Sequence, residues 1–404
     1  RQDKADAINI INSMKEKGVL DELGFGALRQ AFANCFFPGT STIQTRAKYF
    51  FIVPYILQDF ISSASASEND FQKFIADSQN KISGNGGREN RVGKLLVENA
   101  GDDVRLGIIG SRSIKGGKWV ERTPLSIYWN GLRTFQFFQS ANPNFTYADF
   151  MMCVFTFARN KAESKNWVKS NKKDESDDFD AGNFSKISPL ARLETYSKTW
   201  EKDIQITLSK EEAELLESKI VSSVPDSLLA FLLKNKIDIS SSGNDFELFT
   251  KLVSSKIDSD TARKLDLANK ANEFYYLTML RYSFLLSKGV VSEIADEWEN
   301  TWREKKRICN EFDVETTFKT MDIQNQRLKI FLLRLQKSFL ENDLDSCDEI
   351  IRKREKELKG NRAKLTNPDY ELTEMDSRIF RRFDYRFGNT AAIINDIYQG
   401  EKQC

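Results

Sequence analysis

The side chains best suited to chemistry in this sequence are basic and aromatic, and they gather between Arg105 and Arg133. This stretch contains six basic residues and one acidic residue, Glu121. The basic residues are Arg105, Arg112, Lys115, Lys118, Arg122 and Arg133. Basic side chains neutralise phosphates, and the planes of Trp119, Tyr128 and Trp129 could stack on exposed bases. The stretch predicts contact with nucleic acid. The alternative is that the rings belong to the core and the charges are only solvated.

A second candidate is the corner FFPGTSTIQTRAKYF, residues 36–50, where two basic side chains follow small polar residues. A first helix ends at Pro-Gly, and Thr40–Thr42 offer hydroxyl caps for a second helix. Arg46 and Lys48 would then lie one turn into that helix, whose start favours anions. No acidic residue occurs in residues 23–58. We expect either a structural corner or a phosphate site made by Arg46 and Lys48.

The sequence contains no histidine, and this absence removes whole classes of enzyme. Without imidazole the chain cannot build a Ser-His-Asp triad, a Cys-His pair or the usual zinc sites of proteases and deaminases. The five cysteines are scattered without a C-x-x-C pair and indicate no disulfide framework and no zinc knuckle. We predict no catalytic residue, no metal ligand and no cofactor, and we expect a non-catalytic chain.

Carboxylate chemistry with Mg²⁺ is the enzymatic alternative that survives the absence of histidine. Acidic pairs on charged helices usually form solvated faces, so their presence alone is weak evidence for a site. The pairs that could serve a nuclease are Asp102 with Asp103, Glu297 with Glu299, and Asp345 with Asp348 and Glu349. A magnesium-dependent carboxylate nuclease therefore remains the alternative function.

The elements that must position these residues are mainly helical. Apolar residues at steps of three and four predict helices on both sides of the corner. Small apolar clusters on either side of Gly116-Gly117 predict a β-hairpin or wing, and Ser126 can cap the helix that follows Pro124. Helix, hairpin and helix in a basic region are the ingredients of a winged-helix-like unit.

The second half of the chain predicts a bundle of long helices. Ser209 followed three residues later by Glu212 is a capping box, and the segments beyond it keep apolar residues near a period of 3.6 over many turns. Between the halves, DESDDFD at 174–180 reads as a solvated loop. We expect a basic N-terminal unit at 1–165, a charged linker at 166–185 and a helical scaffold domain at 186–404.

No membrane contact is predicted. The longest apolar runs, such as YFFIVPYIL at 49–57, are far shorter than the roughly 20 residues that span a bilayer. The first residues have neither the plan of a secretion signal nor that of a transit peptide. We expect a cytoplasmic protein.

Two motifs carry a resemblance to a known family. The chain contains F-P-G-T-S at 37–41 and S-I-Y-W-N-G-L at 126–132, and with stretches near residues 208–233 and 383–400 it resembles a bacterial family of unknown function. Members tend to be encoded beside helicases and phospholipase D-like nucleases in defence islands, so the resemblance implies an accessory role in anti-phage immunity. It implies no catalytic residues.

Together with this resemblance, the observations favour a non-catalytic nucleic-acid-binding and scaffold subunit of a bacterial anti-phage defence complex, which binds DNA and acts with a helicase or phospholipase D-like nuclease partner. The absence of histidine excludes the chain itself as the phospholipase D-like nuclease. A pure protein-interaction adaptor is the second alternative. The residues predicted to contact nucleic acid are Arg46, Lys48, Arg112, Lys115, Lys118, Arg122, Trp129 and Arg133.

Overall fold

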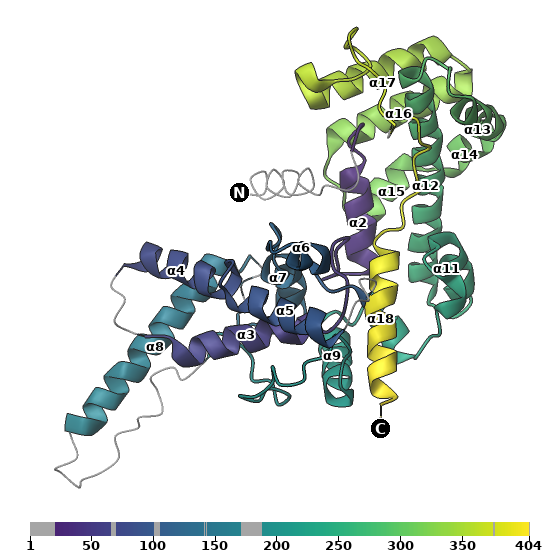
Figure 1. Cartoon of the computed structure of the whole chain (residues 1–404). Helices are drawn as coiled ribbons and strands as arrows, with labels where there is room; N and C mark the ends of the chain where they lie inside the picture. Colours follow the sequence, from purple (N-terminus) through teal and green to yellow (C-terminus); the bar gives the residue numbers. More distant parts are fainter. Residues whose placement is uncertain are drawn as a thin grey trace. The chain divides into compact units, whose positions relative to one another are not determined.

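The regular secondary structure of the described chain is almost entirely helical (Figure 1). The computed structural model describes residues 21–65, 70–100, 106–140, 142, 144–170, 188–374 and 376–403, with the backbone alone at 165–170. Within these ranges no strand is present, and an isolated antiparallel bridge joins Phe138 to Leu190. The mainly helical fold class is confirmed.

The β-hairpin predicted around Gly116-Gly117 is wrong. This stretch forms the short helix α6 (Ser111–Lys115) and a turn, and no strand lies in the described residues on either side. Gly110 and Gly117 adopt φ near +75°, which reverses the chain locally. The N–H of Lys118 donates to the Ser113 carbonyl (2.9 Å), so the backbone bonds to its own turn instead of to a partner strand. The unit is therefore not a winged helix.

The chain forms two compact units, and each combines segments that are distant in sequence. Unit 1 holds the residues up to Phe36 with Ile239–Phe387, and unit 2 holds Phe37–Asp238 with Gly388–Cys404. These units divide the chain at other places than the expected domains 1–165 and 186–404. The expected linker, 166–185, lies outside the described residues from 171 onward, and helix α8 (Tyr147–Ser170) runs through its first residues.

Unit 1 is a helical bundle around the long helix α12 (Ser259–Leu286), which packs against α13, α14 and α17. Asp258 caps α12 by accepting from the N–H groups of Asp260 and Thr261. The predicted bundle of long helices is present here. The other helices of unit 1 are α2 (Gly26–Phe36), η2 (Ser240–Ser242), α11 (Phe246–Val253), α13 (Ser292–Arg303), α14 (Lys305–Glu311), α15 (Val314–Thr320), α16 (Gln326–Glu341), α17 (Leu344–Lys359) and η3 (Gly360–Arg362).

Unit 2 is centred on α3 (Tyr49–Ser63), an apolar helix with Pro54 inside it, which packs against α4, α5 and α7. The capping box predicted at Ser209 and Glu212 is confirmed at the start of α9. The other helices of unit 2 are α4 (Phe71–Ser83), α5 (Arg88–Asn99), α6, α7 (Pro124–Thr134), α8, α9 (Lys210–Ser223), α10 (Leu228–Lys234) and α18 (Phe387–Glu401), whose first residue belongs to unit 1.

The helix after the corner begins later than predicted. Turns at residues 42–43 and 47–48 flank irregular backbone, and α3 starts at Tyr49, so Thr40–Thr42 are not its caps. The Thr40 hydroxyl instead donates to the Phe37 carbonyl (2.7 Å) and closes the Pro-Gly turn. Arg46 and Lys48 therefore lie before the helix and not one turn inside it.

Across the described residues, none of the helices combines the length and apolar character needed to cross a bilayer.

Candidate nucleic-acid interface and buried charged network

The F-P-G-T-S and S-I-Y-W-N-G-L stretches meet in unit 2. The Tyr128 hydroxyl accepts from the N–H groups of Thr45 (2.9 Å) and Arg46 (3.1 Å) and donates to the Arg46 carbonyl (2.7 Å). A methyl group on Gly131 would lie 2.6 Å from the Gly39 carbonyl oxygen. The S-I-Y-W-N-G-L helix therefore fits against the F-P-G-T-S turn, and the pair of motifs forms a packed corner.

Arg46 is held by a carboxylate from the C-terminal helix. Its Nε lies 3.0 and 2.9 Å from the two carboxylate oxygens of Asp396, and its Nη2 lies 2.8 Å from Oδ1. Its Nη1 donates to the Leu106 carbonyl (2.7 Å), and the N–H of Ala47 donates to Asp396 Oδ2 (2.8 Å). With the Arg46 side chain 16 % exposed, these contacts use its donors inside the protein.

Lys48 is also paired. Its Nζ lies 2.6 Å from Glu212 Oε2, and the Tyr55 hydroxyl donates to the other oxygen of Glu212 (3.1 Å). Glu212 accepts in addition from the N–H of Ser209 as part of the capping box (2.9 Å). Of the two interpretations of the corner, the geometry favours the structural one, so we leave Arg46 and Lys48 out of the proposed interface.

The basic segment, residues 106–122, presents exposed cations from α6 and the turn after it. Arg112, Lys115 and Lys118 are exposed, whereas Arg122 is half-buried. Arg133 on α7 is half-buried too and donates to the Asn130 side chain (2.7 Å). Arg105 lies outside the described residues. The structure therefore brings three of the predicted cations, Arg112, Lys115 and Lys118, onto one short exposed segment.

The inner side of the basic segment is packed closely. The N–H of Ile109 donates to the buried Tyr49 hydroxyl (2.8 Å). The Trp119 ring lies against Gly93 of α5, where an added methyl would meet it at 3.1 Å, and Val120 fills the space beside Gly110. The exposed cations therefore project from a segment that a backbone hydrogen bond fixes to α3 and that the packing of Trp119 fixes to α5.

Glu89, at the start of α5, holds the first turn of α7, which follows the basic segment. It is 2 % exposed, and its Oε1 accepts from the N–H of Leu125 in the first turn of α7 (2.6 Å). Burial raises the pKa of Glu89 to about 7, against the opposing hydrogen bonds from Ser83, Leu125 and Thr123. Sequence reasoning missed this residue, since its neighbours in R-E-N-R are charged or polar and give no sign of burial.

The aromatic rings near the basic segment are engaged inside unit 2. The indole N–H of Trp129 donates to the Phe145 carbonyl (3.0 Å), and the centroid of its ring lies 4.5 Å from the centroid of the Phe138 ring. Tyr128 is fully buried. Stacking of Trp129 on a base, which the sequence suggested, would require this cluster to open, so we leave Trp129 out of the interface.

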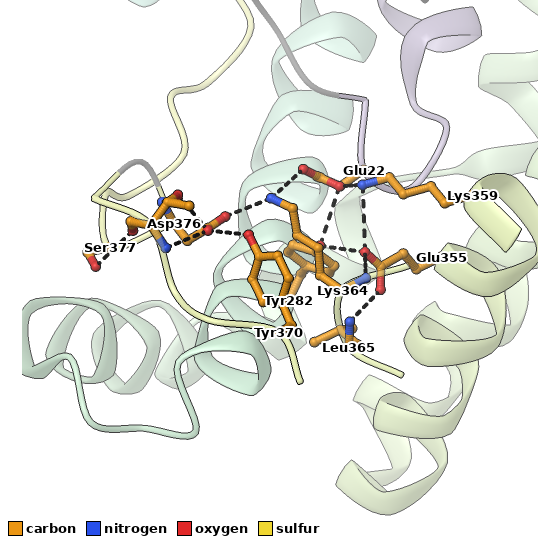
Figure 2. Close-up of polar contacts among 10 residues, drawn as sticks. Glu22, Tyr282, Glu355, Lys359, Lys364, Leu365, Tyr370, Asp376 and Ser377 are labelled. Atoms are coloured by element: carbon orange, nitrogen blue, oxygen red, sulfur yellow. Dashed lines mark hydrogen bonds and ion pairs between the residues drawn. The ribbon is translucent and has the colours of Figure 1, made fainter. Parts of the chain in front are cut away.

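A buried network of charged residues lies in unit 1 (Figure 2). It brings carboxylates and ammonium groups together with phenols, and its members come from the N-terminal segment, α12, α17 and the chain after η3. Its two glutamates are 1 % and 0 % exposed. The members are Glu22, Tyr282, Glu355, Lys359, Lys364, Tyr370 and Asp376.

Each carboxylate in the network has partners from other segments. Glu355 accepts from the Tyr282 hydroxyl (2.7 Å) and from the N–H groups of Lys364 (3.0 Å) and Leu365 (2.9 Å). Lys359 forms an ion pair with Glu22, and Lys364 Nζ lies 3.3 Å from Glu22 Oε1. Buried charges are tolerated when they are paired and hydrogen-bonded, so this network ties distant segments together.

Asp376 is the third carboxylate of the network. Its carboxylate lies 2.7 Å from Lys364 Nζ and accepts from the hydroxyls of Tyr370 (2.5 Å) and Thr373 (2.7 Å). Burial alone would raise the pKa of Asp376, but these three donors lower it well below the ordinary value. Nothing in the spacing of the seven residues predicted the network, because its members are spread from residue 22 to residue 376.

Two of the carboxylates proposed for Mg²⁺ have other partners. Glu297 accepts from the Tyr276 hydroxyl (2.8 Å), and Asp348 forms a two-pronged pair with Arg281 (2.6 and 2.8 Å). Asp102 and Asp103 lie outside the described residues. In the ranges that the structure covers, no three Cys, Asp or Glu side chains are grouped as a metal site would need.

The fold and surface define a helical protein of two units, with an exposed basic segment on a packed support in one and a buried charged network in the other. Residues 1–188, a little under half of the chain, match a family described as "Family of unknown function (DUF6361)". This match agrees with the resemblance to an uncharacterised family over that part of the sequence. No curated protein and no solved structure matches the chain.

Proposed function

We propose that this protein is a non-catalytic nucleic-acid-binding subunit that contacts the phosphate backbone through Arg112, Lys115 and Lys118. The observation that carries the proposal is that these three cations are exposed together on a segment fixed to α3 and α5. Cations on a fixed segment lose less conformational entropy when they bind phosphates than cations on a mobile loop. The contact is electrostatic and independent of base sequence.

Duplex DNA is the partner that this surface fits best. Base stacking needs an exposed ring, and Trp119, Tyr128 and Trp129 are packed against other parts of unit 2. Duplex DNA carries the higher density of phosphate charge, and each contact contributes a salt slope of about 0.9, compared with about 0.7 on a single strand. A surface of cations alone should therefore favour the duplex.

The proposal includes a place in an anti-phage defence complex. It follows the resemblance of the sequence to a family encoded beside helicases and phospholipase D-like nucleases. In such a complex this chain would hold DNA, and a partner would supply the chemistry that a chain without histidine lacks.

The test is a fluorescence anisotropy titration of labelled duplex DNA at several salt concentrations. Replacing Arg112, Lys115 and Lys118 together by glutamate should weaken binding and reduce the salt slope by about 0.9 for each phosphate that is no longer neutralised. The matched control replaces Lys73, Lys202 and Lys234, which are exposed elsewhere in unit 2, by glutamate and changes the net charge equally. No binding by the unmodified protein, or equal weakening in both triple variants, would refute the proposed interface.

A further inference from the structure

Unit 2 contains a pocket of about 710 Å³ that the basic segment does not line. This volume lies in the range of about 300–1,000 Å³ that is typical of small-molecule sites. The pocket lies between the last turns of α3, the middle of α8 and residues 188–196.

The backbone beside the pocket is fixed by the bridge between Phe138 and Leu190. The N–H of Ala191 donates to the Phe137 carbonyl (2.8 Å), and the N–H of Gln139 donates to the Pro189 carbonyl (3.0 Å). The Tyr196 hydroxyl donates to Asp59 on α3 (2.5 Å) at the far end of the same segment. Both ends of this wall are therefore held by hydrogen bonds to the rest of unit 2.

The lining combines an apolar floor with a half-buried ring. Ile61, Leu190 and Leu193 line the pocket and are themselves buried in unit 2. Phe157 comes from α8 and is half-buried. An apolar floor beside an aromatic side chain suits a flat ring, because stacking and burial of apolar area both favour it.

Two cations and two amides from different elements also line the pocket. Lys161 on α8 and Arg192 on the opposite segment are exposed, and within the described residues neither has a hydrogen bond or an ion pair. The side chains of Gln58 and Gln139 are likewise without a hydrogen-bond partner among the described residues, and each amide can donate and accept. Glu194 is the carboxylate of the lining. Elsewhere in unit 2 the less exposed cations Arg46, Lys48 and Arg88 are paired with carboxylates.

We propose that this pocket binds a nucleotide. Lys161 and Arg192 would take the phosphates, the amides of Gln58 and Gln139 would bond the edges of the base, and the Phe157 ring would pack against its plane. Glu194 can accept hydrogen bonds from ribose hydroxyls. The ligand must combine negative charge, a flat ring and hydrogen-bonding edges, because the pocket offers a partner for each. It can be a free nucleotide or the phosphorylated end of a nucleic-acid strand.

The test uses isothermal titration calorimetry of the full chain with ATP, GTP, CTP and UTP. Two further probes, inorganic triphosphate and adenosine, separate the phosphate contacts from the base contacts. A short single strand with a 5′-phosphate and the same strand without it distinguish a free nucleotide from a strand end. Arg192→Glu and Lys161→Glu should each weaken binding about tenfold or more, the effect expected on removing a charge-assisted hydrogen bond. Lys198→Glu, exposed on the neighbouring turn and absent from the lining, should leave affinity unchanged.

A nucleotide or a 5′-phosphorylated strand that binds more tightly than triphosphate alone, with weaker binding in both pocket variants, supports the proposal. Three results overturn it: no binding of any nucleotide or strand end at millimolar concentration, equal binding of ATP and triphosphate, or unchanged affinity in both pocket variants. Thermal unfolding of each variant shows whether it is folded. The smaller change Gln139→Ala should alter the preference among the four bases. Duplex binding through the basic segment is measured separately and does not depend on these outcomes.

Discussion

Arg46 and Asp396 lie 350 residues apart in the sequence and form a two-pronged ion pair in unit 2, with Nε and Nη2 of the arginine each within 3.0 Å of the carboxylate. The same carboxylate accepts the N–H of Ala47. Helix α18 therefore completes the corner that the F-P-G-T-S motif begins. A basic residue that looks unpaired in the sequence is neutralised by a residue near the other end of the chain.

Breaking this pair should destabilise the fold. Asp396→Ala leaves Arg46 largely buried without its partner, and removing one member of a buried pair costs about 3 kcal/mol of unfolding free energy. Urea denaturation measures the destabilisation. The Arg46→Glu variant should unfold at about the same urea concentration as Asp396→Ala. Lys94→Glu, at an exposed site on α5, is the control and should change stability by less than about 0.5 kcal/mol. An Arg46→Glu variant of normal stability that no longer binds DNA would restore the phosphate-site interpretation.

Glu89 should make stability fall as the pH rises. The pKa of this carboxyl is about 7 in the folded chain, above its ordinary value near 4.5, so the folded state holds the proton more tightly. The stabilisation is complete below about pH 4.5 and is lost as the pH rises through 7. Glu89→Gln keeps an acceptor for Leu125 and carries no charge, so it should gain about 3 kcal/mol relative to the unmodified protein between pH 5 and pH 8.

Denaturation curves at the two pH values, for the unmodified protein and for Glu89→Gln, give this difference directly. Glu98→Gln, on the exposed side of the same helix, is the control and should show no such gain. Parallel pH profiles for all three proteins would mean that Glu89 titrates normally.

Asp376 should make the stability of the fold decrease as the pH falls, which is the opposite of the effect of Glu89. Its folded pKa lies below the ordinary value because Lys364, Tyr370 and Thr373 hold the charged form, so its contribution is present at neutral pH and is lost as the pH falls through the acid range. Asp376→Asn should be less stable than the unmodified protein at pH 7 and should lose less stability between pH 5 and pH 2. Thermal unfolding across this range measures both effects, with the exposed Asp369→Asn as control. Equal acid sensitivity of Asp376→Asn and the unmodified protein would contradict the assignment.

Gly131 should not accept a side chain. An added methyl would lie 2.6 Å from the Gly39 carbonyl oxygen and 2.7 Å from the Phe50 ring, so Gly131→Ala must push two packed segments apart. Overpacking of this kind costs about 1–3 kcal/mol. Gly86→Ala, with open space around its Cβ position, is the matched control and should be near neutral by chemical denaturation. If Gly131→Ala is equally neutral, the two motifs are not in close contact.

Local patterns in the sequence predict local structure well. The capping box at Ser209 and the long amphipathic helices of unit 1 are both predictable, because a cap and a helical period depend on residues within one or two turns of each other. The turn at Gly116-Gly117 is not predictable from the sequence. A glycine at positive φ is equally compatible with a β-hairpin and with the turn after a short helix. The start of α3 is predicted too early for a similar reason. The Thr40 hydroxyl could have capped a helix, but it closes the preceding turn instead.

By itself the sequence determined that this chain is helical, that it lacks the imidazole on which many enzymes depend, and that its basic residues cluster in a few segments. Only the tertiary structure decided which of those basic residues are exposed. Arg46 and Lys48 meet carboxylates from residues 396 and 212, whereas Arg112, Lys115 and Lys118 remain on the surface. The physical reason is that the state of a charge depends on its neighbours in space, and in this protein those neighbours lie up to 350 residues away along the chain.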